Sequence, residues 1–356
     1  MKRISSILTI LAVSATAATA QNVMTLEGEL PGDYNGKKVV LVDLDTRSHL
    51  DSTTVKAGKL KFTTKVTTAT PAALTIDGHR VLNFILEPGT AAINGETGQV
   101  RGTALNDLNE SYGTKLDSIH EAYKKTQKEK MKSAKDEEEM KKIAAEIYEQ
   151  EAEAYGDILL SAYKDNKTNA VGYMWFLQVA NGMSVSEIDE LLDGAADWIK
   201  NSKAVASYKK VAMSLESTSA GKMFTDFSVK TSSGKTEKLS DYVGKGDYVI
   251  ADFFASWCGP CRREMPTLKG IYEKYNGKGL KVVGVAVWDE PADTKKCVEE
   301  LKLPWTIIDN AQSGPTDIYG ISGIPTIIVF APDGTIVTRE LRGAELAAKI
   351  DELLAK

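Results

Sequence analysis

The feature that most constrains this chain is a Cys-x-x-Cys pair placed between an apolar run and a segment predicted to be a helix. Cys258 and Cys261 follow the apolar stretch 248–254 and open the segment 262–275. Two cysteines three positions apart on a helix lie on nearly the same face, close enough for a disulfide. The helix N-terminus favours a thiolate at Cys258, and a thiolate is the nucleophile of disulfide exchange. This layout is typical of a thiol–disulfide redox site.

Two other interpretations of the pair need features that the chain offers poorly. A structural zinc site needs four ligands, but Cys297 is the only further cysteine, and His49, His79 and His120 all lie far upstream. A purely structural disulfide closing so short a loop would add little stability. We therefore expect a redox disulfide formed by Cys258 and Cys261, with no metal and no separate cofactor.

The first twenty residues have the pattern of a secretory signal. Lys2 and Arg3 precede the apolar run 4–13, and the small residues 18–20 form a cleavage site. The apolar run is too short to anchor the chain in a bilayer. We expect export to the periplasm, cleavage before Gln21 and no membrane span in the mature protein.

The net charge of the chain limits the kinds of partner it can bind. Without Lys2 and Arg3 the chain carries 42 basic and 49 acidic residues, a net charge of −7. That balance argues against nucleic acid or an anionic membrane surface as a partner.

Three cysteines are too few for a disulfide scaffold. Cys297 lies in the short amphipathic segment 294–301, and we expect it to be a buried free thiol.

The mature length suggests two or three domains. Residues 21–103 contain short apolar runs at 38–42, 60–62 and 73–76, bounded by Gly, Pro and Asp-Gly turn signals. This spacing predicts a small antiparallel sandwich or barrel, an all-β N-terminal domain.

Residues 104–216 are predicted to be helical, because apolar residues recur at steps of three and four. The stretch 124–142 is dense in Lys and Glu, which predicts a solvated hairpin tip or a loop. A coiled-coil dimer is the alternative, although the heptads do not last. The apolar run 172–177 is expected to pack in a core. Residues 217–221 mark the next domain boundary.

Residues 217–356 alternate between strand and helix patterns. A second apolar strand is predicted at 281–287, a helix at 289–303, a hairpin at 326–338 and a final helix at 344–354. Continuous apolar strands indicate a sheet that is covered on both faces.

This C-terminal stretch resembles the thioredoxin-like α/β domain of TlpA/ResA-type thiol–disulfide oxidoreductases. The motifs that carry the resemblance are Ala255–Pro266, around the cysteines, and Gly323–Thr326, the loop with a cis-proline. The region before it resembles the uncharacterised domain often fused to this family. The matching segments there are Leu26-x-Gly28, Asp51–Thr53, Gly58–Phe62, Phe84–Gly89 and Gly102-Thr103.

Two acidic residues are candidates for the base that deprotonates Cys261. Asp252 lies in the apolar strand, where burial would raise the pKa of its carboxyl. It could then accept the Cys261 proton when that thiol resolves a mixed disulfide. The resemblance implies an active-site glutamate at Glu264. Which of the two acids serves as base stays open.

The resemblance also implies the client-binding surface. A cis bond before Pro325 would let the Ile324 backbone pair with an extended client strand. We expect Trp257, Gly259 and Pro260 to join Ile324 and Pro325 in that surface, with Trp257 as an exposed lip. We also expect solvent to reach Cys258 more readily than Cys261.

The sequence thus predicts a periplasmic thiol–disulfide oxidoreductase that reduces disulfides in client proteins and serves cell redox homeostasis. Electrons would come from a membrane-bound thiol donor. One alternative is a thiol peroxidase, although peroxidases of this fold use a lone cysteine preceded by Thr-x-x, a pattern that precedes neither Cys258 nor Cys261. The other is a binding module with a redox-sensing disulfide. Clients, donor and net direction stay open.

Overall fold

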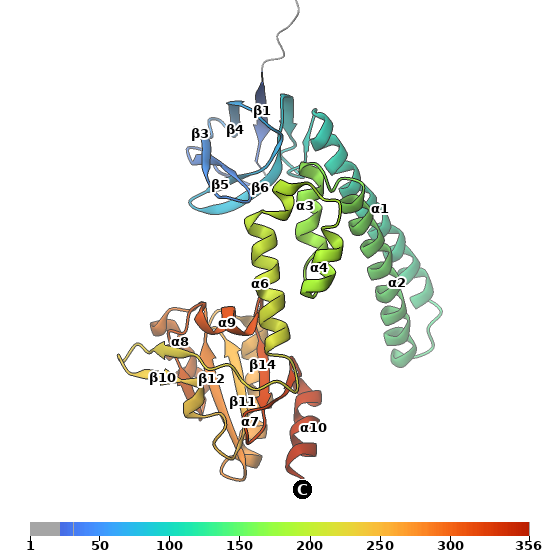
Figure 1. The fold of residues 1–356 in the computed structure, drawn as a ribbon. Helices are drawn as coiled ribbons and strands as arrows, with labels where there is room; N and C mark the ends of the chain where they lie inside the picture. The colour runs from blue at the N-terminus through green and yellow to red at the C-terminus, as the bar shows by residue number, and fades with distance from the viewer. Residues whose placement is uncertain (1–21, 31, 356) are drawn as a thin grey trace, which may run out of the picture. The chain divides into compact units, whose positions relative to one another are not determined.

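The computed structural model describes residues 22–30 and 32–355 (Figure 1). The predicted signal segment, 1–20, lies outside the described residues. Strands come first along the chain, helices follow, and an α/β region ends it. This order confirms the predicted fold class. Within the described ranges no helix combines the length and apolar content needed to cross a bilayer.

The N-terminal region is built from strands that form two four-stranded sheets, in the orders β4-β1-β7-β8 and β3-β2-β5-β6. The strands are β1 (Val23–Glu29), β2 (Lys38–Asp43), β3 (His49–Thr54), β4 (Lys59–Lys65), β5 (Thr70–Ile76), β6 (His79–Leu86), β7 (Gly89–Ile93) and β8 (Val100–Arg101). Both sheets contribute to one apolar core, which includes Met24, Leu41 and Leu74. The strands therefore form a sandwich.

One strand pair departs from the antiparallel pairing that the sequence predicted. β1 pairs with β4 in antiparallel register but with β7 in parallel register. The reason lies in the connection, because β6 belongs to the opposite sheet. The chain crosses between sheets at Glu87 and Pro88, and β7 then runs beside β1 in the same direction.

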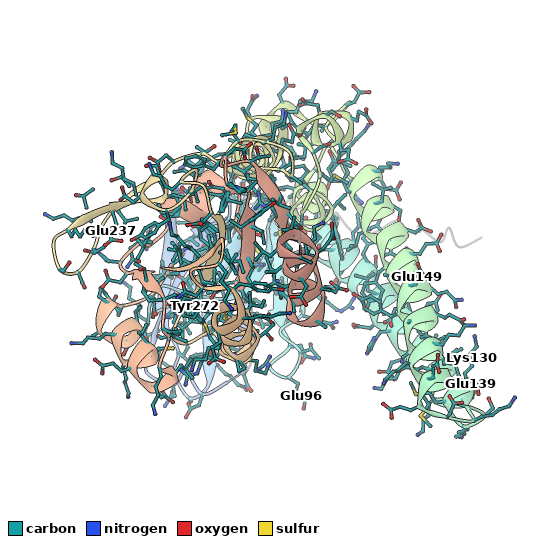
Figure 2. The ribbon with its side chains drawn as sticks, turned by 90° about the horizontal axis from the view of Figure 1, so that it is seen from below. Glu96, Lys130, Glu139, Glu149, Glu237 and Tyr272 are labelled. Atoms are coloured by element: carbon teal, nitrogen blue, oxygen red, sulfur yellow. A yellow bond between two sulfur atoms is a disulfide. The ribbon has the colours of Figure 1, made fainter. Side chains whose placement is uncertain are left out.

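The middle of the chain contains the helices α1 (Ala104–Met131), α2 (Glu137–Lys164), α3 (Ala170–Val179), α4 (Val185–Leu191), α5 (Asp197–Lys200) and α6 (Lys203–Ser217). α1 and α2 form a hairpin, and the Lys- and Glu-rich stretch forms its tip. Figure 2 shows Lys130, Glu139 and Glu149 along this hairpin. The Asp136 side chain accepts a hydrogen bond from Glu139 N at 2.8 Å, which caps α2. The predicted solvated hairpin tip is confirmed.

The apolar run 172–177 lies in α3 and packs as predicted. Tyr173 and Phe176 are fully buried, and the ring of Phe176 lies 6.0 Å from that of Tyr163 in α2. Aromatic burial of this size stabilises the helix through tertiary packing rather than through intrinsic propensity.

The C-terminal region is an α/β domain. Its elements are β9 (Ser228–Lys230), β10 (Thr236–Lys238), the 3₁₀ turn η1 (Leu239–Asp241), β11 (Tyr248–Phe254), α7 (Gly259–Tyr275), β12 (Leu280–Ala286), α8 (Pro291–Leu301), β13 (Thr306–Ile308), α9 (Gly314–Tyr319), β14 (Thr326–Phe330), β15 (Ile336–Arg339) and α10 (Gly343–Leu354). β11, β12 and β13 are parallel, whereas β14 and β15 are antiparallel neighbours on the other side of β11.

Apolar clusters cover both faces of this five-stranded sheet, as the continuous apolar strands predicted. On one face the cluster includes Leu268 from α7 and Ile350 from α10. On the other face it includes Leu239 from η1 and Tyr319 from α9. The helix that carries the cysteines is therefore held against the sheet by a buried apolar face.

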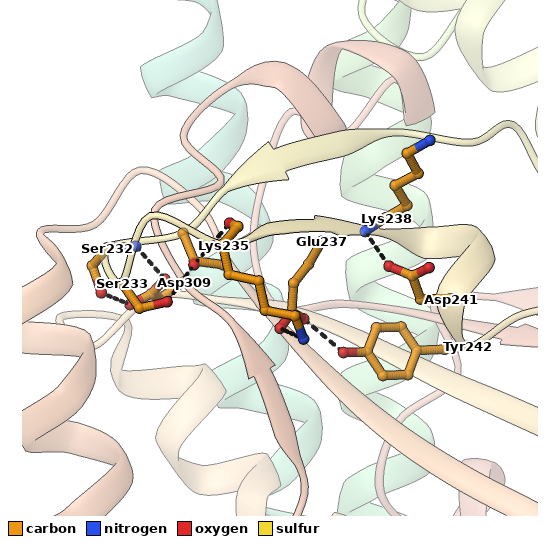
Figure 3. Close-up of polar contacts among 9 residues, drawn as sticks. Ser232, Ser233, Lys235, Glu237, Lys238, Asp241, Tyr242 and Asp309 are labelled. Carbon is orange, nitrogen blue, oxygen red and sulfur yellow. Dashed lines mark hydrogen bonds and ion pairs between the residues drawn. The ribbon is translucent and has the colours of Figure 1, made fainter.

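The β9–β10 hairpin is fastened by polar contacts (Figure 3). Glu237, which is buried, accepts a hydrogen bond from Tyr242 Oη at 2.6 Å and pairs with Lys235 Nζ at 2.9 Å. Burial, with the hydrogen bond and charge of Glu237, raises the pKa of Tyr242. Ser232 N donates to Asp309 Oδ1 at 2.9 Å, which ties the turn to the loop after β13.

The described residues form two compact units. One holds residues 22–179, apart from residue 31, together with 194–203. The other holds 180–193 and 204–355. The predicted helical stretch 104–216 is thus shared between the units, and α4 and most of α6 belong with the α/β domain. The domain limits inferred from sequence remain predictions.

Candidate active site

The two cysteines form a disulfide at the start of α7. Cys258 is the N-cap residue, and its Cα lies 5.3 Å from that of Cys261. The Cys261 backbone N–H donates to Cys258 Sγ at 3.2 Å. This donor is one of the N–H groups that an α-helix leaves unpaired at its first turn. In the reduced protein the same geometry favours negative charge on Cys258.

The two cysteines differ little in exposure. Cys258 is 3 % exposed and Cys261 1 %, so both residues are buried in the disulfide form and the expected difference in solvent access between them is small. The cis-proline loop is the reason, because the Ile324 carbonyl oxygen lies 3.7 Å from Cys258 Sγ. The exposed part of the motif is the Gly259-Pro260 dipeptide.

The peptide bond between Ile324 and Pro325 is cis, which confirms the expectation. Pro325 is buried and Ile324 is half-buried. Thr326 begins β14, pairs with Phe253 of β11, and donates its hydroxyl to Gly323 O at 2.8 Å. The strand that leads to the cysteines and the strand that follows the loop are therefore direct neighbours.

Asp252 lies in β11 and faces the side of the sheet that holds the cysteines. Its strand neighbours Ile250 and Phe254 belong to the core cluster that contains both sulfurs, and side chains alternate along a strand. Asp252 is 1 % exposed, and neither carboxyl oxygen has a hydrogen-bond partner among the described residues. Burial, with a smaller effect from the charge of Glu264, raises the pKa of Asp252 to about 7.

Glu264 occupies a different environment. It is half-buried, and its Oε1 accepts a hydrogen bond from Gly343 N at 2.7 Å. Gly343 is the first residue of α10, so Glu264 pairs one of the free N–H groups at that helix N-terminus. Glu264 of α7 therefore contacts the start of α10, 79 residues further along the chain.

Trp257 is 62 % exposed beside Cys258, as expected for a surface lip, and its Nε1 donates to Trp288 O at 3.0 Å. The next residue, Asp289, is buried and was missed by the sequence analysis. It accepts hydrogen bonds from Ser256 N and Ser256 Oγ, both at 2.8 Å, and from Thr294 Oγ1 at 2.7 Å. Trp288 and Asp289 thus hold the loop before the cysteines. The sequence signal that could have identified Asp289 is an acidic residue two positions after the apolar run 281–287.

Cys297 is free and buried, as predicted. Its environment is less apolar than expected, because Arg262 Nη1 donates to Cys297 Sγ at 3.2 Å and Arg262 Nη2 pairs with Glu300 at 2.9 Å. Burial raises the pKa of the Cys297 thiol. In the described part of the chain no group of three or more His, Cys, Asp or Glu residues is arranged to hold a metal ion.

A Cys-x-x-Cys disulfide at a helix N-terminus, opposite a cis-proline on a sheet of this topology, defines a thioredoxin-like thiol–disulfide oxidoreductase. The chain matches the AhpC/TSA family over residues 220–339 and a domain of unknown function, DUF4369, over residues 24–109. It is 30 % identical to the thiol-disulfide oxidoreductase ResA of Geobacillus thermodenitrificans over 128 residues, which span 36 % of this chain and 70 % of that protein. The chain belongs to the ResA family of thiol-disulfide oxidoreductases.

Other relatives align in the same way. The ResA protein of Bacillus thuringiensis subsp. konkukian is 28 % identical over 141 residues, covering 40 % of this chain and 80 % of that protein. The thioredoxin domain of a thiol-disulfide oxidoreductase from Bacteroides vulgatus is 30 % identical, with a TM-score of 0.34, and covers 38 % of this chain and 98 % of that one. A thiol:disulfide interchange protein from Bacteroides sp. is 31 % identical, with a TM-score of 0.35, and covers 39 % and 93 %.

Proposed function

We propose that this protein is an exported, periplasmic disulfide reductase that acts on disulfide-containing client proteins. The observation that carries the proposal is the Cys258–Cys261 disulfide lying against the backbone of a cis-proline loop. The Ile324 carbonyl beside the sulfur offers a backbone acceptor to an extended client segment. Gly259 and Pro260, exposed between the cysteines, and Trp257 beside them would complete the client surface.

The reaction follows from the two thiols. In the reduced protein the Cys258 thiolate attacks one sulfur of a client disulfide, and the other client sulfur leaves as a thiolate. Cys261, once deprotonated, attacks Cys258 Sγ and breaks the mixed disulfide. The client leaves as a dithiol, and the enzyme keeps the Cys258–Cys261 disulfide. Two electrons pass from enzyme to client, and an external dithiol must return them.

Asp252 is the better candidate for the base that accepts the Cys261 proton. It faces the cysteines and has no competing hydrogen bond in the described structure, and a pKa of about 7 matches proton transfer at neutral pH. Glu264 already accepts a hydrogen bond from Gly343 N. We assign to Glu264 the support of α10 and an electrostatic effect on Asp252.

The direction and the place of the reaction rest on sequence features. The Gly-Pro dipeptide adds neither a histidine nor a charge to stabilise the Cys258 thiolate, which favours a reducing pair. The secretory pattern in residues 1–20 supports export, and a membrane-bound thiol is the proposed donor. No separate cofactor is needed, because the cysteine pair itself holds the electrons. We assign client selection to residues 21–103 and 104–216, and exchange to residues 217–356.

The deciding experiment is the reduction potential of the Cys258–Cys261 pair, measured by equilibration with glutathione or dithiothreitol buffers. We expect a value near that of thioredoxin, about −270 mV. The variant Cys297→Ser serves as a control that removes the third thiol. A potential on the oxidising side of about −180 mV would assign the protein to disulfide formation or isomerisation instead.

A further inference from the structure

A pocket of about 280 Å³ lies within the unit that carries the disulfide. Its walls come from three segments that are distant in sequence. These are the turn after α3, one face of α6, and the segment just before the cis-proline loop. The residues that matter here are Met183, Ser207, Tyr208, Val211, Leu215 and Ser322. The pocket is lined mainly by apolar side chains.

Close packing fastens α6 to the α/β domain. A Cβ atom added to Gly320 would lie 2.8 Å from Leu215 Cγ and 2.9 Å from Val211 O, so only glycine fits at this crossing. Lys210 Nζ pairs with Asp317 at 2.9 Å, and Ser214 Oγ donates to Asp317 O at 2.9 Å. The α6 wall of the pocket therefore has a defined position.

The wall after α3 is tied down as well. Lys209 of α6 pairs with Asp189 of α4, and Val185 N donates to Glu216 Oε1 at 3.1 Å. A capping box between Ser184 and Glu187 begins α4 directly after Met183. Charged groups near the pocket thus have partners of their own, and a bound side chain would meet a preformed site.

One wall of the pocket belongs to the segment that leads into the cis-proline loop. Ser322 stands two residues before Ile324, whose carbonyl oxygen lies 3.7 Å from Cys258 Sγ. Two residues span about 7 Å at most. A client strand paired along this loop would therefore carry a side chain to the pocket within a few residues of its own cysteine.

We propose that this pocket receives one apolar side chain of the client polypeptide, close in sequence to the client cysteine that Cys258 attacks. The inference rests on the proposed function and adds a substrate preference to it. The volume lies below the 300–1,000 Å³ or so of small-molecule sites, which suits a single side chain. The turn after α3 and α6 precede the residues that match the AhpC/TSA family. The preference would therefore come from parts of the chain outside that match.

The test uses the full-length reduced protein and peptides joined by a disulfide, in a Ser/Gly background. Each peptide carries Leu or Asp at one position, one to four residues on either side of the cysteine. The readout is the ratio of kcat/KM for the Leu and Asp peptides at each position. We expect Leu to be favoured about tenfold at one position, which corresponds to about 1.4 kcal/mol.

The variant Ser207→Glu places a charge in the pocket, and we expect it to bring the ratio close to one. Ala206→Glu puts the same charge on the next residue of α6, which is exposed and does not line the pocket, and it should leave the ratio unchanged. Met183→Ala removes part of the opposite wall, and we expect it to lower the ratio.

Three results would overturn the inference. The first is a Leu-to-Asp ratio of kcat/KM that is the same at every peptide position. The second is an equal effect of Ser207→Glu and Ala206→Glu on this ratio. The third is that the native chain forms a dimer which Ser207→Glu dissociates and Ala206→Glu does not. The last result would make a second copy of the chain the occupant. Failure of the native protein to turn over oxidised glutathione would instead count against the proposed function.

Discussion

Glu87 in the N-terminal unit and Asp252 in the thioredoxin-like unit are both buried carboxyl groups, with 7 % and 1 % of their surface exposed. Glu87 Oε1 accepts hydrogen bonds from Leu105 N at 2.7 Å and Asn106 N at 3.0 Å. Both N–H groups belong to the first turn of α1. Asp252 has no hydrogen-bond partner among the described residues.

The hydrogen bonds of Glu87 stabilise the fold, whereas the folded protein disfavours the charged form of Asp252. Glu87 satisfies helix N–H groups that would otherwise be unpaired, and such bonds stabilise a long helix at its start. For Asp252, the rise in pKa from 3.8 to about 7 corresponds to roughly 4 kcal/mol against its charged form. A carboxyl with such a pKa can exchange a proton near neutral pH, and Asp252 lies on the side of the sheet that holds the cysteines.

The largest effect should come from the two cysteines, because they form the disulfide of the unit that also holds Asp252. Cys261→Ser should accumulate mixed disulfides with clients, since the first attack is intact and only resolution is lost. Cys258→Ser should trap none. Non-reducing gels after acid quenching, with release by added dithiol, give the readout. Equal trapping by both variants would overturn the assignment of nucleophile and resolving thiol.

The stability of the disulfide form should depend on pH through Asp252. The pKa of Asp252 is higher in the folded than in the unfolded protein. The contribution of this carboxyl to folding stability is therefore fully present below about pH 4 and is lost as the pH rises to about 7. We expect native protein to lose roughly 4 kcal/mol of unfolding free energy between pH 4 and 8 relative to Asp252→Asn. Urea unfolding at both pH values measures the difference. Parallel pH profiles of the two proteins would contradict the unpartnered state of this carboxyl.

Resolution of the mixed disulfide should slow by about a hundredfold in Asp252→Asn at pH 7, because a general base contributes at least that much. Stopped-flow measurement of client release gives the rate. Glu264→Gln is the matched control and should slow release much less. A larger loss in Glu264→Gln would make Glu264 the base and would reverse our assignment.

Glu87→Ala should lower stability and leave the exchange reaction unchanged, which is the opposite of what we expect for Asp252→Asn. We expect its unfolding free energy to fall by about 1–3 kcal/mol, because buried N–H groups of α1 lose their acceptor. Disulfide exchange should keep its native rate. Glu96→Ala, at an exposed position of the same region, is the control and should leave stability nearly unchanged. Loss of exchange activity in a folded Glu87→Ala protein would break the separation between the two acids.

The smallest effect is expected at Cys297. Its buried thiol, with a raised pKa, should react very slowly with an alkylating reagent in the native oxidised protein and fully after unfolding. Cys297→Ser should keep the Cys258–Cys261 disulfide and its turnover. Peptide mapping that finds Cys297 bridged to either active-site cysteine would contradict the pairing described here.

The sequence by itself determined the local elements and the redox motif. Apolar runs bounded by turn signals placed β2, β4, β5, β11, β12 and β14, and the Cys-x-x-Cys motif placed the start of α7. These features depend on neighbours in the chain, through side-chain periodicity and the backbone preferences of Gly and Pro. For the same reason the resemblance of Gly323–Thr326 to a cis-proline loop was enough to predict the cis bond.

Only the tertiary structure decided which polar groups meet. The partner of Glu264 lies 79 residues away at Gly343, and the partner of Ser256 lies 33 residues away at Asp289. The parallel pairing of β1 with β7 likewise depends on a crossing between sheets. No local pattern encodes such contacts, because they arise when separate elements pack. Asp252 has no hydrogen-bond partner in the described part of the chain, and this too was decided by the tertiary structure, since it depends on everything that packs around β11.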